Sequence, residues 1–306
     1  WGAVGGGGVA PFAVSDDGTL IYVPGSSMPS SSSQRVLALA DRGGKRELLG
    51  LPPGSYGYPR VSPDGRQLAV RTDDGGGTIW IYDLSGKSAL RKLTLEGTNS
   101  YPRWSPDSRR LAFFSNRENK PGIFVQAADG SGAAERLPGL PEAPEYIPTS
   151  WSPDGKALAF HAYNKANDLG IWTVSLTGER KAESFIDAPG SSQADAAFSP
   201  DGRWLAYVSQ ETGSQQIYVE PYPKAGAGRR QISREDRNFG PAWSVDGNEL
   251  FYYQADSRRL VSVPIRTNPS FSFGQPVPIP IEGMVQLDGP RNWDLMPDGK
   301  RFLVVL

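Results

Sequence analysis

The segment Trp151-Ser-Pro-Asp-Gly-Lys-Ala-Leu-Ala-Phe160 joins a turn motif to the start of a β-strand. Proline sets φ for the second position of a type I turn, Asp suits the third position, and Gly takes the left-handed conformation that closes a hairpin with a bulge. Leu158 and Phe160 are two residues apart, so their side chains share one face of a strand. The segment therefore predicts a tight turn followed by a strand with one buried face.

The same turn motif recurs along the chain. Ser-Pro-Asp-Gly occurs at 62–65, 152–155 and 199–202, and variants occur at 15–18, 105–108, 244–247 and 296–299. We call the Asp of each motif the anchor, and the anchors are Asp17, Asp64, Asp107, Asp154, Asp201, Asp246 and Asp298. Their spacings are 47, 43, 47, 47, 45 and 52 residues. The chain thus consists of seven units of about 45 residues, a period typical of propeller blades.

The flanks of the anchors repeat as well. Apolar residues stand three residues before each anchor and four and six residues after it, as Trp151, Leu158 and Phe160 do. Two further strand-like segments follow in most units, for example 79–81 with 91–95 and 217–219 with 230–233. Four short strands per unit predict an all-β propeller.

We expect residues 1–306 to form a single domain of seven four-stranded blades. The seventh unit ends after two strands, so the Gly-rich segment Trp1–Ala10 is expected to complete the last blade. Six blades plus an extra hairpin is the alternative. Ser26–Ser33 is expected to be a flexible loop between the second and third strands of the first unit.

Composition excludes several classes of function. Lys and Arg number 32 against 33 Asp and Glu, so the chain has no basic field for binding nucleic acid. Cysteine is absent, which excludes thiolate metal sites and disulfides. Its apolar runs are far shorter than the roughly 20 residues that span a bilayer, so we expect no membrane insertion by this chain. It begins at Trp1, which predicts that a signal peptide or an upstream region has been removed.

With these anchors, the chain resembles the TolB-type, WD-like propeller repeats of bacteria. Phe198–Val208 (FSPDGRWLAYV), Gln216–Pro223 (QIYVEPYP) and Trp243–Tyr253 (WSVDGNELFYY) carry the resemblance. These segments, with Val263–Pro280 and Asp16–Gly25, are also similar to the propeller that follows the kinase domain and membrane span of bacterial serine/threonine protein kinases, and to secreted TolB-like proteins. The resemblance implies a periplasmic or extracellular module, with a kinase domain and membrane span outside this chain.

Catalytic machinery is sparse in the sequence. The one histidine, His161, follows a core aromatic on a predicted strand, which favours a structural role. A Gly-x-Ser-x-Gly elbow and the kinase motifs are absent from the sequence. The seven anchor aspartates are explained by turn chemistry.

A candidate ligand site comes from equivalent positions of two units, Tyr58-Pro59-Arg60 and Tyr101-Pro102-Arg103. Two guanidiniums beside two phenols at the channel mouth would hold a carboxylate, including a peptide C-terminus. The predicted ligand-binding residues are Tyr58, Arg60, Tyr101, Arg103, Asp195, Asn292 and Asp294. Internal pairing of the arginines with Asp195 or Asp294 is an equal alternative. We expect these residues on the face opposite the Ser-Pro-Asp-Gly turns, where the longer loops gather.

The sequence thus favours a noncatalytic propeller, a sensor or scaffold for protein–protein interaction, that binds a peptide, protein or cell-envelope ligand and needs no cofactor. One alternative is a Ca²⁺-dependent lactonase or phosphoesterase, because carboxylates and amides near the channel would supply oxygen ligands. The competing reading of those residues is that they cap loops. A second alternative is the gating propeller of a prolyl-oligopeptidase-like protein.

Overall fold

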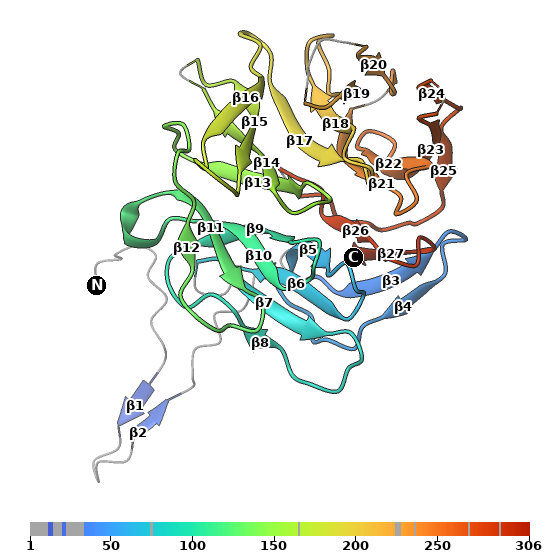
Figure 1. The fold of residues 1–306 in the computed structure, drawn as a ribbon. Coiled ribbons are helices and arrows are strands. Elements are labelled where there is room, and N and C mark those ends of the chain that lie inside the picture. Colours follow the sequence, from blue (N-terminus) through green and yellow to red (C-terminus); the bar gives the residue numbers. More distant parts are fainter. Residues whose placement is uncertain are drawn as a thin grey trace, which may run out of the picture.

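The computed structural model describes residues 34–73, 76–164, 166–223, 228–235, 237–268, 270–287 and 289–306, and the backbone pairing of 12–14 with 20–22. Six antiparallel sheets follow one another around a ring, each sheet forming one blade (Figure 1). No helix within these ranges has the length and apolar character that crossing a bilayer requires. The architecture is an all-β propeller.

Three blades come from consecutive units between residues 57 and 186. Blade 1 contains β5 (Gly57–Val61), β6 (Gln67–Thr72), β7 (Thr78–Asp83) and β8 (Arg91–Lys92). Blade 2 contains β9 (Asn99–Trp104), β10 (Arg110–Ser115), β11 (Gly122–Ala127) and β12 (Glu135–Arg136), with a short 3-10 helix η1 (Arg117–Asn119) between β10 and β11. Blade 3 contains β13 (Tyr146–Trp151), β14 (Ala157–Tyr163), β15 (Leu169–Ser175) and β16 (Ala182–Ile186).

The next two blades continue the pattern. Blade 4 contains β17 (Gln193–Phe198), β18 (Trp204–Ser209), β19 (Gln216–Pro221) and β20 (Arg230–Gln231). Blade 5 contains β21 (Asn238–Trp243), β22 (Glu249–Gln254), β23 (Arg259–Arg266), β24 (Ser272–Phe273) and β25 (Val277–Ile279), and both β24 and β25 pair with β23. The third strands lie where the sequence predicts them, and the fourth strands are shorter than predicted.

Blade 6 joins the two ends of the ring. Its inner strands are β26 (Trp293–Leu295) and β27 (Arg301–Val305), and its outer strands are β3 (Leu37–Asp41) and β4 (Arg46–Leu48). The seam is the pairing of β27 with β3, which runs from Arg301 opposite Asp41 to Val305 opposite Leu37. Strands near both ends of the sequence therefore close the ring.

The prediction of seven blades is wrong, and the arrangement is the six-blade alternative. The first and seventh units each supply half of blade 6, so seven anchors produce six sheets. The remaining strands of the first unit, β1 (Phe12–Val14) and β2 (Leu20–Tyr22), pair with each other in a separate two-stranded sheet. The predicted closing segment Trp1–Ala10 and the predicted loop Ser26–Ser33 lie outside the described residues.

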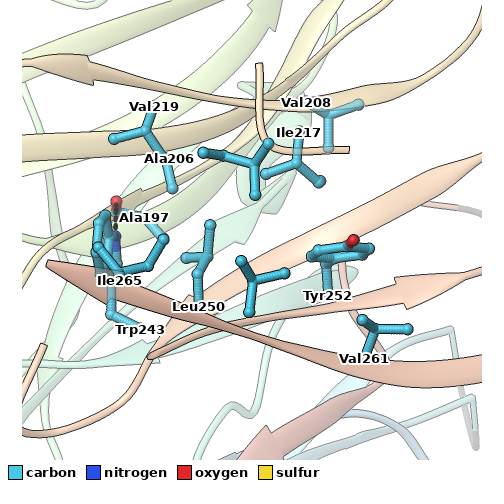
Figure 2. Close-up of a cluster of buried hydrophobic side chains, with 12 residues drawn as sticks. Ala197, Ala206, Val208, Ile217, Val219, Trp243, Leu250, Tyr252, Val261 and Ile265 are labelled. Carbon is cyan, nitrogen blue, oxygen red and sulfur yellow. Dashed lines mark hydrogen bonds between the residues drawn. The ribbon is translucent and has the colours of Figure 1, made fainter. Parts of the chain in front are cut away.

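The core consists of layers between neighbouring blades. In all six blades the residues four and six positions after the anchor are at most 1% exposed. Between blades 4 and 5, side chains of β18 and β19 face those of β22 and β23, among them Val219, Leu250 and Tyr252 (Figure 2). Each blade therefore buries its apolar face only by packing against the next one.

Hydrogen bonds from indole rings connect the blades. The Trp three residues before the anchor donates from Nε1 to a backbone carbonyl of the preceding blade in three blades. These bonds join Trp104 to Arg60 at 2.8 Å, Trp151 to Arg103 at 3.1 Å, and Trp243 to Ala197 at 3.1 Å, the last drawn in Figure 2. The repeated aromatic before the turn thus has a structural explanation.

Candidate functional site

The first strand of each blade lines a central channel. Position −4, four residues before the anchor, contributes one side chain from each blade to the wall of a cavity of about 490 Å³. Its occupants in blade order are Arg60, Arg103, Ser150, Ala197, Ala242 and Asp294. The repeat is regular in backbone but not in charge, because charged residues fill this position only in blades 1, 2 and 6.

The cavity opens on the face that carries the Ser-Pro-Asp-Gly turns. Its rim consists of the residues directly before the anchors, namely Pro63, Pro106, Pro153, Pro200, Val245 and Pro297. Val245 is 60% exposed. The sequence placed the ligand site on the opposite face, whereas this cavity combines an apolar rim at the turn face with a charged wall deeper in the channel.

Arg60 and Arg103 are buried and held by backbone carbonyls. Arg60 donates from Nη1 to the carbonyl of Trp293 at 3.2 Å and from Nη2 to that of Arg291 at 2.9 Å, which ties blade 1 to blade 6. Arg103 donates from Nε to the carbonyl of Thr149 at 2.7 Å, which ties blade 2 to blade 3. Both arginines are thus internal struts as well as parts of the cavity wall, and their hydrogen bonds go to backbone carbonyls rather than to the carboxylates of Asp195 and Asp294.

A third arginine, Arg291, completes the cluster. Its Nη2 donates to Oδ1 of Asp294 at 2.6 Å, and its Nη1 donates to the carbonyl of Pro241 at 3.2 Å. The other carboxylate oxygen of Asp294 accepts from the backbone N–H of Val61 at 2.9 Å. Sequence reasoning missed Arg291 because it lies seven residues before the anchor, outside every repeated position.

Asp195 is the second carboxylate near these arginines. Its Oδ2 accepts from the backbone N–H of Gly240 at 3.2 Å, and its buried Oδ1 has no hydrogen-bond partner. Burial raises the pKa of Asp195, although Arg103 and Arg60 oppose that rise. Asp195 lines a separate cavity of about 10 Å³ together with Arg103 and Arg291. That volume is about one water molecule.

The cluster holds more positive than negative charge. Burial lowers the pKa of Arg103 to about 9, and repulsion by Arg291 adds to the effect. Burial also lowers the pKa of Arg60, again with repulsion from its two arginine neighbours. Because a guanidinium resists deprotonation in proteins, three cations face the carboxylates of Asp195 and Asp294. One positive charge is left without a partner in the cluster.

Tyr58, Tyr101 and Asn292 lie on the other side of the arginine cluster and do not line the 490 Å³ cavity. The two tyrosine rings meet edge to face, with centroids 4.8 Å apart. Oδ1 of Asn292 accepts from the backbone N–H of Tyr58 at 2.7 Å. Of the seven predicted residues, the structure therefore brings Arg60, Arg103 and Asp294 to this cavity, and it places Asp195 beside them.

The inner strands bulge at position −6, six residues before the anchor. Tyr58, Tyr101 and Asp195 have φ of 51°, 59° and 55° there, a left-handed conformation that is unusual for a bulky side chain. Gly240 has φ of 60° at the same position, and a Cβ on it would lie 2.3 Å from Cβ of Arg291. Glycine at position 240 thus lets the segment before β26 approach blade 5.

Comparisons with known proteins agree with the fold. The family profile described as "TolB beta propeller domain" matches residues 10–139 and 136–270. The chain belongs to the TolB β-propeller family. The "Tol-Pal system protein TolB" of Francisella tularensis subsp. mediasiatica is 30% identical over 207 residues, which are 67% of this chain and 46% of that protein. The chain thus matches about half the length of its curated TolB relatives.

Solved structures resemble this TolB-type propeller in fold. A putative TolB from Agrobacterium tumefaciens aligns with a TM-score of 0.69 at 18% identity, covering 89% of this chain and 97% of that one. A periplasmic gluconolactonase from Pseudomonas aeruginosa aligns with a TM-score of 0.54 at 20% identity, covering 89% of each chain. At such identities the likeness shows the fold alone, and fold does not decide function.

Several of the oxygen atoms that the calcium alternative would use as ligands already accept hydrogen bonds in this TolB-type propeller. Both carboxylate oxygens of Asp294 and the amide oxygen of Asn292 already accept hydrogen bonds. Three guanidiniums lie around the remaining carboxylate, and a divalent cation there would face their repulsion. Within the described ranges, no three His, Cys, Asp or Glu residues gather closely enough to hold a metal.

The amide side chains near the inner-strand starts serve as loop caps. The amide of Asn99 donates to the carbonyls of Glu96 and Gly97, each at 2.9 Å, and that of Asn238 donates to Glu235 at 2.8 Å. The amide of Asn292 donates to Val285 at 2.7 Å. Of the two roles that the sequence left open for these residues, the structure shows the capping role.

Proposed function

We propose that this propeller is a noncatalytic module outside the cytoplasm that binds a peptide segment of a protein partner in the turn-face cavity. The observation that carries the proposal is the cavity itself, which combines an exposed apolar rim with polar groups deeper in the channel. Ligand sites are typically concave and mostly apolar, with a few fixed polar groups. At about 490 Å³ the volume suits a short segment of chain.

Family membership supports this kind of partner. The curated relatives are named as proteins of the Tol-Pal system. An envelope protein is therefore the partner class we propose for this chain. A kinase domain and membrane span upstream, implied by the sequence resemblance, stay a prediction and would make the same propeller a sensor.

The hydrolase alternative gains no support from the channel. His161 is buried, and its Nδ1 accepts a hydrogen bond from the backbone N–H of Asp195 at 3.2 Å. Burial and Arg103 lower its pKa to about 3, so the imidazole is neutral at physiological pH. A general base must reach the proton that it removes. His161 is buried and is not among the residues that line the cavity.

Site-directed photocrosslinking tests the proposal. A benzophenone amino acid at Val245 places the probe on the cavity rim. Two exposed positions serve as controls: Leu95, which is 80% exposed, and Lys120, which lies in the loop between β10 and β11. In cells that make the protein, we expect an adduct of discrete mass from position 245 and none from 95 or 120. An adduct from position 120 instead would mean that the partner binds the face opposite the Ser-Pro-Asp-Gly turns, which would contradict the proposal.

A further inference from the structure

We propose that the partner segment inserts a carboxylate, with an apolar group beside it, so that the carboxylate faces Arg60, Arg103 and Arg291. This inference rests on the proposed function and names the chemistry of the ligand. Arg60 and Arg103 are only 2% and 6% exposed, and Arg291 lines the same cavity. Three independent features of the described residues carry the inference.

The first feature is charge. Burying an ion is costly unless an opposite charge and hydrogen bonds compensate it. Asp294 forms an ion pair with Arg291, with 2.6 Å between Nη2 and Oδ1, and Asp195 is the other nearby carboxylate. With three guanidiniums and two carboxylates, one positive charge is compensated only by the dipoles of backbone carbonyls. An incoming carboxylate would balance the cluster, whereas an incoming cation would add to its repulsion.

The second feature is unused hydrogen-bonding capacity. The buried Nε atoms of Arg60 and Arg291 have no hydrogen-bond partner. Buried donors are nearly always paired in folded proteins, so two unpaired donors in one cavity wall indicate a place where a ligand could accept hydrogen bonds. Both residues belong to the cavity wall. An oxyanion bound at this depth would supply acceptors where the protein itself supplies none.

The third feature is the apolar surround. Besides the arginines, the cavity is lined by Trp104, Trp151 and Trp243 and by the proline rim. A free inorganic anion would leave that surface bare. A carboxylate attached to an apolar side chain would cover it and bury apolar area as well. A peptide C-terminus or an acidic side chain next to an apolar residue has this composition.

The test uses a small pair of probes on the whole chain. N-acetylphenylalanine has a carboxylate beside an aromatic ring, and N-acetylphenylalanine amide has the same shape without the charge. Binding is measured in a low-chloride buffer by calorimetry and by NMR shifts of the tryptophan indole N–H groups, three of which belong to residues that line the cavity. We expect the acid to bind at least about tenfold more tightly than the amide, as a charge-assisted contact implies.

A charge-balancing variant then tests the arginine cluster. Ser150 and Asp294, at position −4, each accept a backbone N–H from the next blade, from Phe198 at 3.1 Å and Val61 at 2.9 Å. Ala197 is the same position in blade 4, so Ala197→Asp should fit there and supply the missing negative charge. Ala197→Asn has the same size without the charge. We expect Ala197→Asp to bind the acid at least about tenfold more weakly than Ala197→Asn does, since the two variants add the same bulk and differ in charge.

The outcomes separate the two proposals. Equal binding of acid and amide, or full binding by Ala197→Asp, overturns the carboxylate inference, while a crosslink at position 245 still upholds the proposed function. Conversely, selective binding of the acid without any crosslink upholds the carboxylate site and overturns the partner proposal. If Ala197→Asp does not fold, the pair Ala242→Asp and Ala242→Asn at the equivalent position in blade 5 replaces it.

Discussion

His161 shows how a single buried side chain couples this fold to pH. It lies on β14, 3% exposed, and its Nδ1 accepts a hydrogen bond from the backbone N–H of Asp195, while Arg103 is close enough to disfavour its protonation. Its pKa falls from about 6.5 to about 3 on folding because burial and Arg103 both penalise the charged ring. The unfolded chain therefore binds a proton at His161 over a pH range in which the folded chain does not.

This difference predicts a pH-dependent stability. Because the folded pKa is depressed, the contribution of His161 is fully present above about pH 6.5 and is lost as pH falls toward 3. The free energy of unfolding should fall by up to ~1.4 kcal/mol per pH unit from this one group. His161→Gln should lack that slope in urea titrations between pH 6.5 and 4.5. Identical slopes for the two proteins would mean that His161 is reached by solvent in the folded state.

At the scale of the element, the Ser-Pro-Asp-Gly turn is a self-contained hydrogen-bonded unit. In blade 3, Ser152 Oγ donates to Asp154 Oδ1 at 2.6 Å and accepts from the backbone N–H of Ala157 at 2.9 Å, and Gly155 has φ of 69°. These bonds recur in neighbouring turns, for example from Ser199 to Asp201 at 2.6 Å. The six anchor aspartates within the described residues thus act in turns, as the sequence predicts.

The Trp before the turn in blades 2, 3 and 5 acts between blades, which leads to a prediction. Trp151→Phe removes the buried bond from Nε1 to the carbonyl of Arg103 and should cost about 1–3 kcal/mol of unfolding free energy. Trp204→Phe is the matched control, because the buried Nε1 of Trp204 has no partner. Chemical denaturation of both variants checks this. Equal losses in the two would show that the inter-blade bond contributes nothing beyond the ring's volume.

At the scale of the whole molecule, ring closure decides the number of blades. The strand β27 pairs with β3 over five residue pairs, and Val36 and Leu306 exchange two backbone hydrogen bonds of 3.0 Å beside that ladder. Arg42 extends the closure to blade 5 by an ion pair with Glu249 of 2.5 Å. The seam thus joins residues that are more than 250 positions apart in sequence.

The closure predicts opposite effects of two truncations. A chain of residues 34–306 contains every strand of the six blades and should keep its melting temperature within about 3 °C. A chain of residues 1–300 lacks β27 and should lose cooperative unfolding, because blade 6 would have no bridge between β26 and β3. Scanning calorimetry measures both. Unfolding of the 34–306 chain would show that the first 33 residues belong to the ring after all.

The sequence by itself determined the repeat, the strand phase and the turn chemistry. These are local properties, because a two-residue period and a turn motif can be recognised within one unit. The structure agrees, since all six residues four positions after the described anchors are buried. It also singled out Arg60 and Arg103 as equivalent residues, and Asp195 and Asp294 as residues near the starts of inner strands. What it could not supply was the partner of each one.

Only the tertiary structure decided the blade number, the face on which the cavity opens and the charge of the channel. Blade number depends on which strands pair at the seam, and split units at the two ends count as one blade. Arg291 enters the channel from a segment outside the repeat, and the proline rim surrounds a cavity only when six turns converge. All three features are relations between residues of different blades. Strand pairing and charge interactions between blades depend on distances in space, and no pattern along the chain specifies those distances.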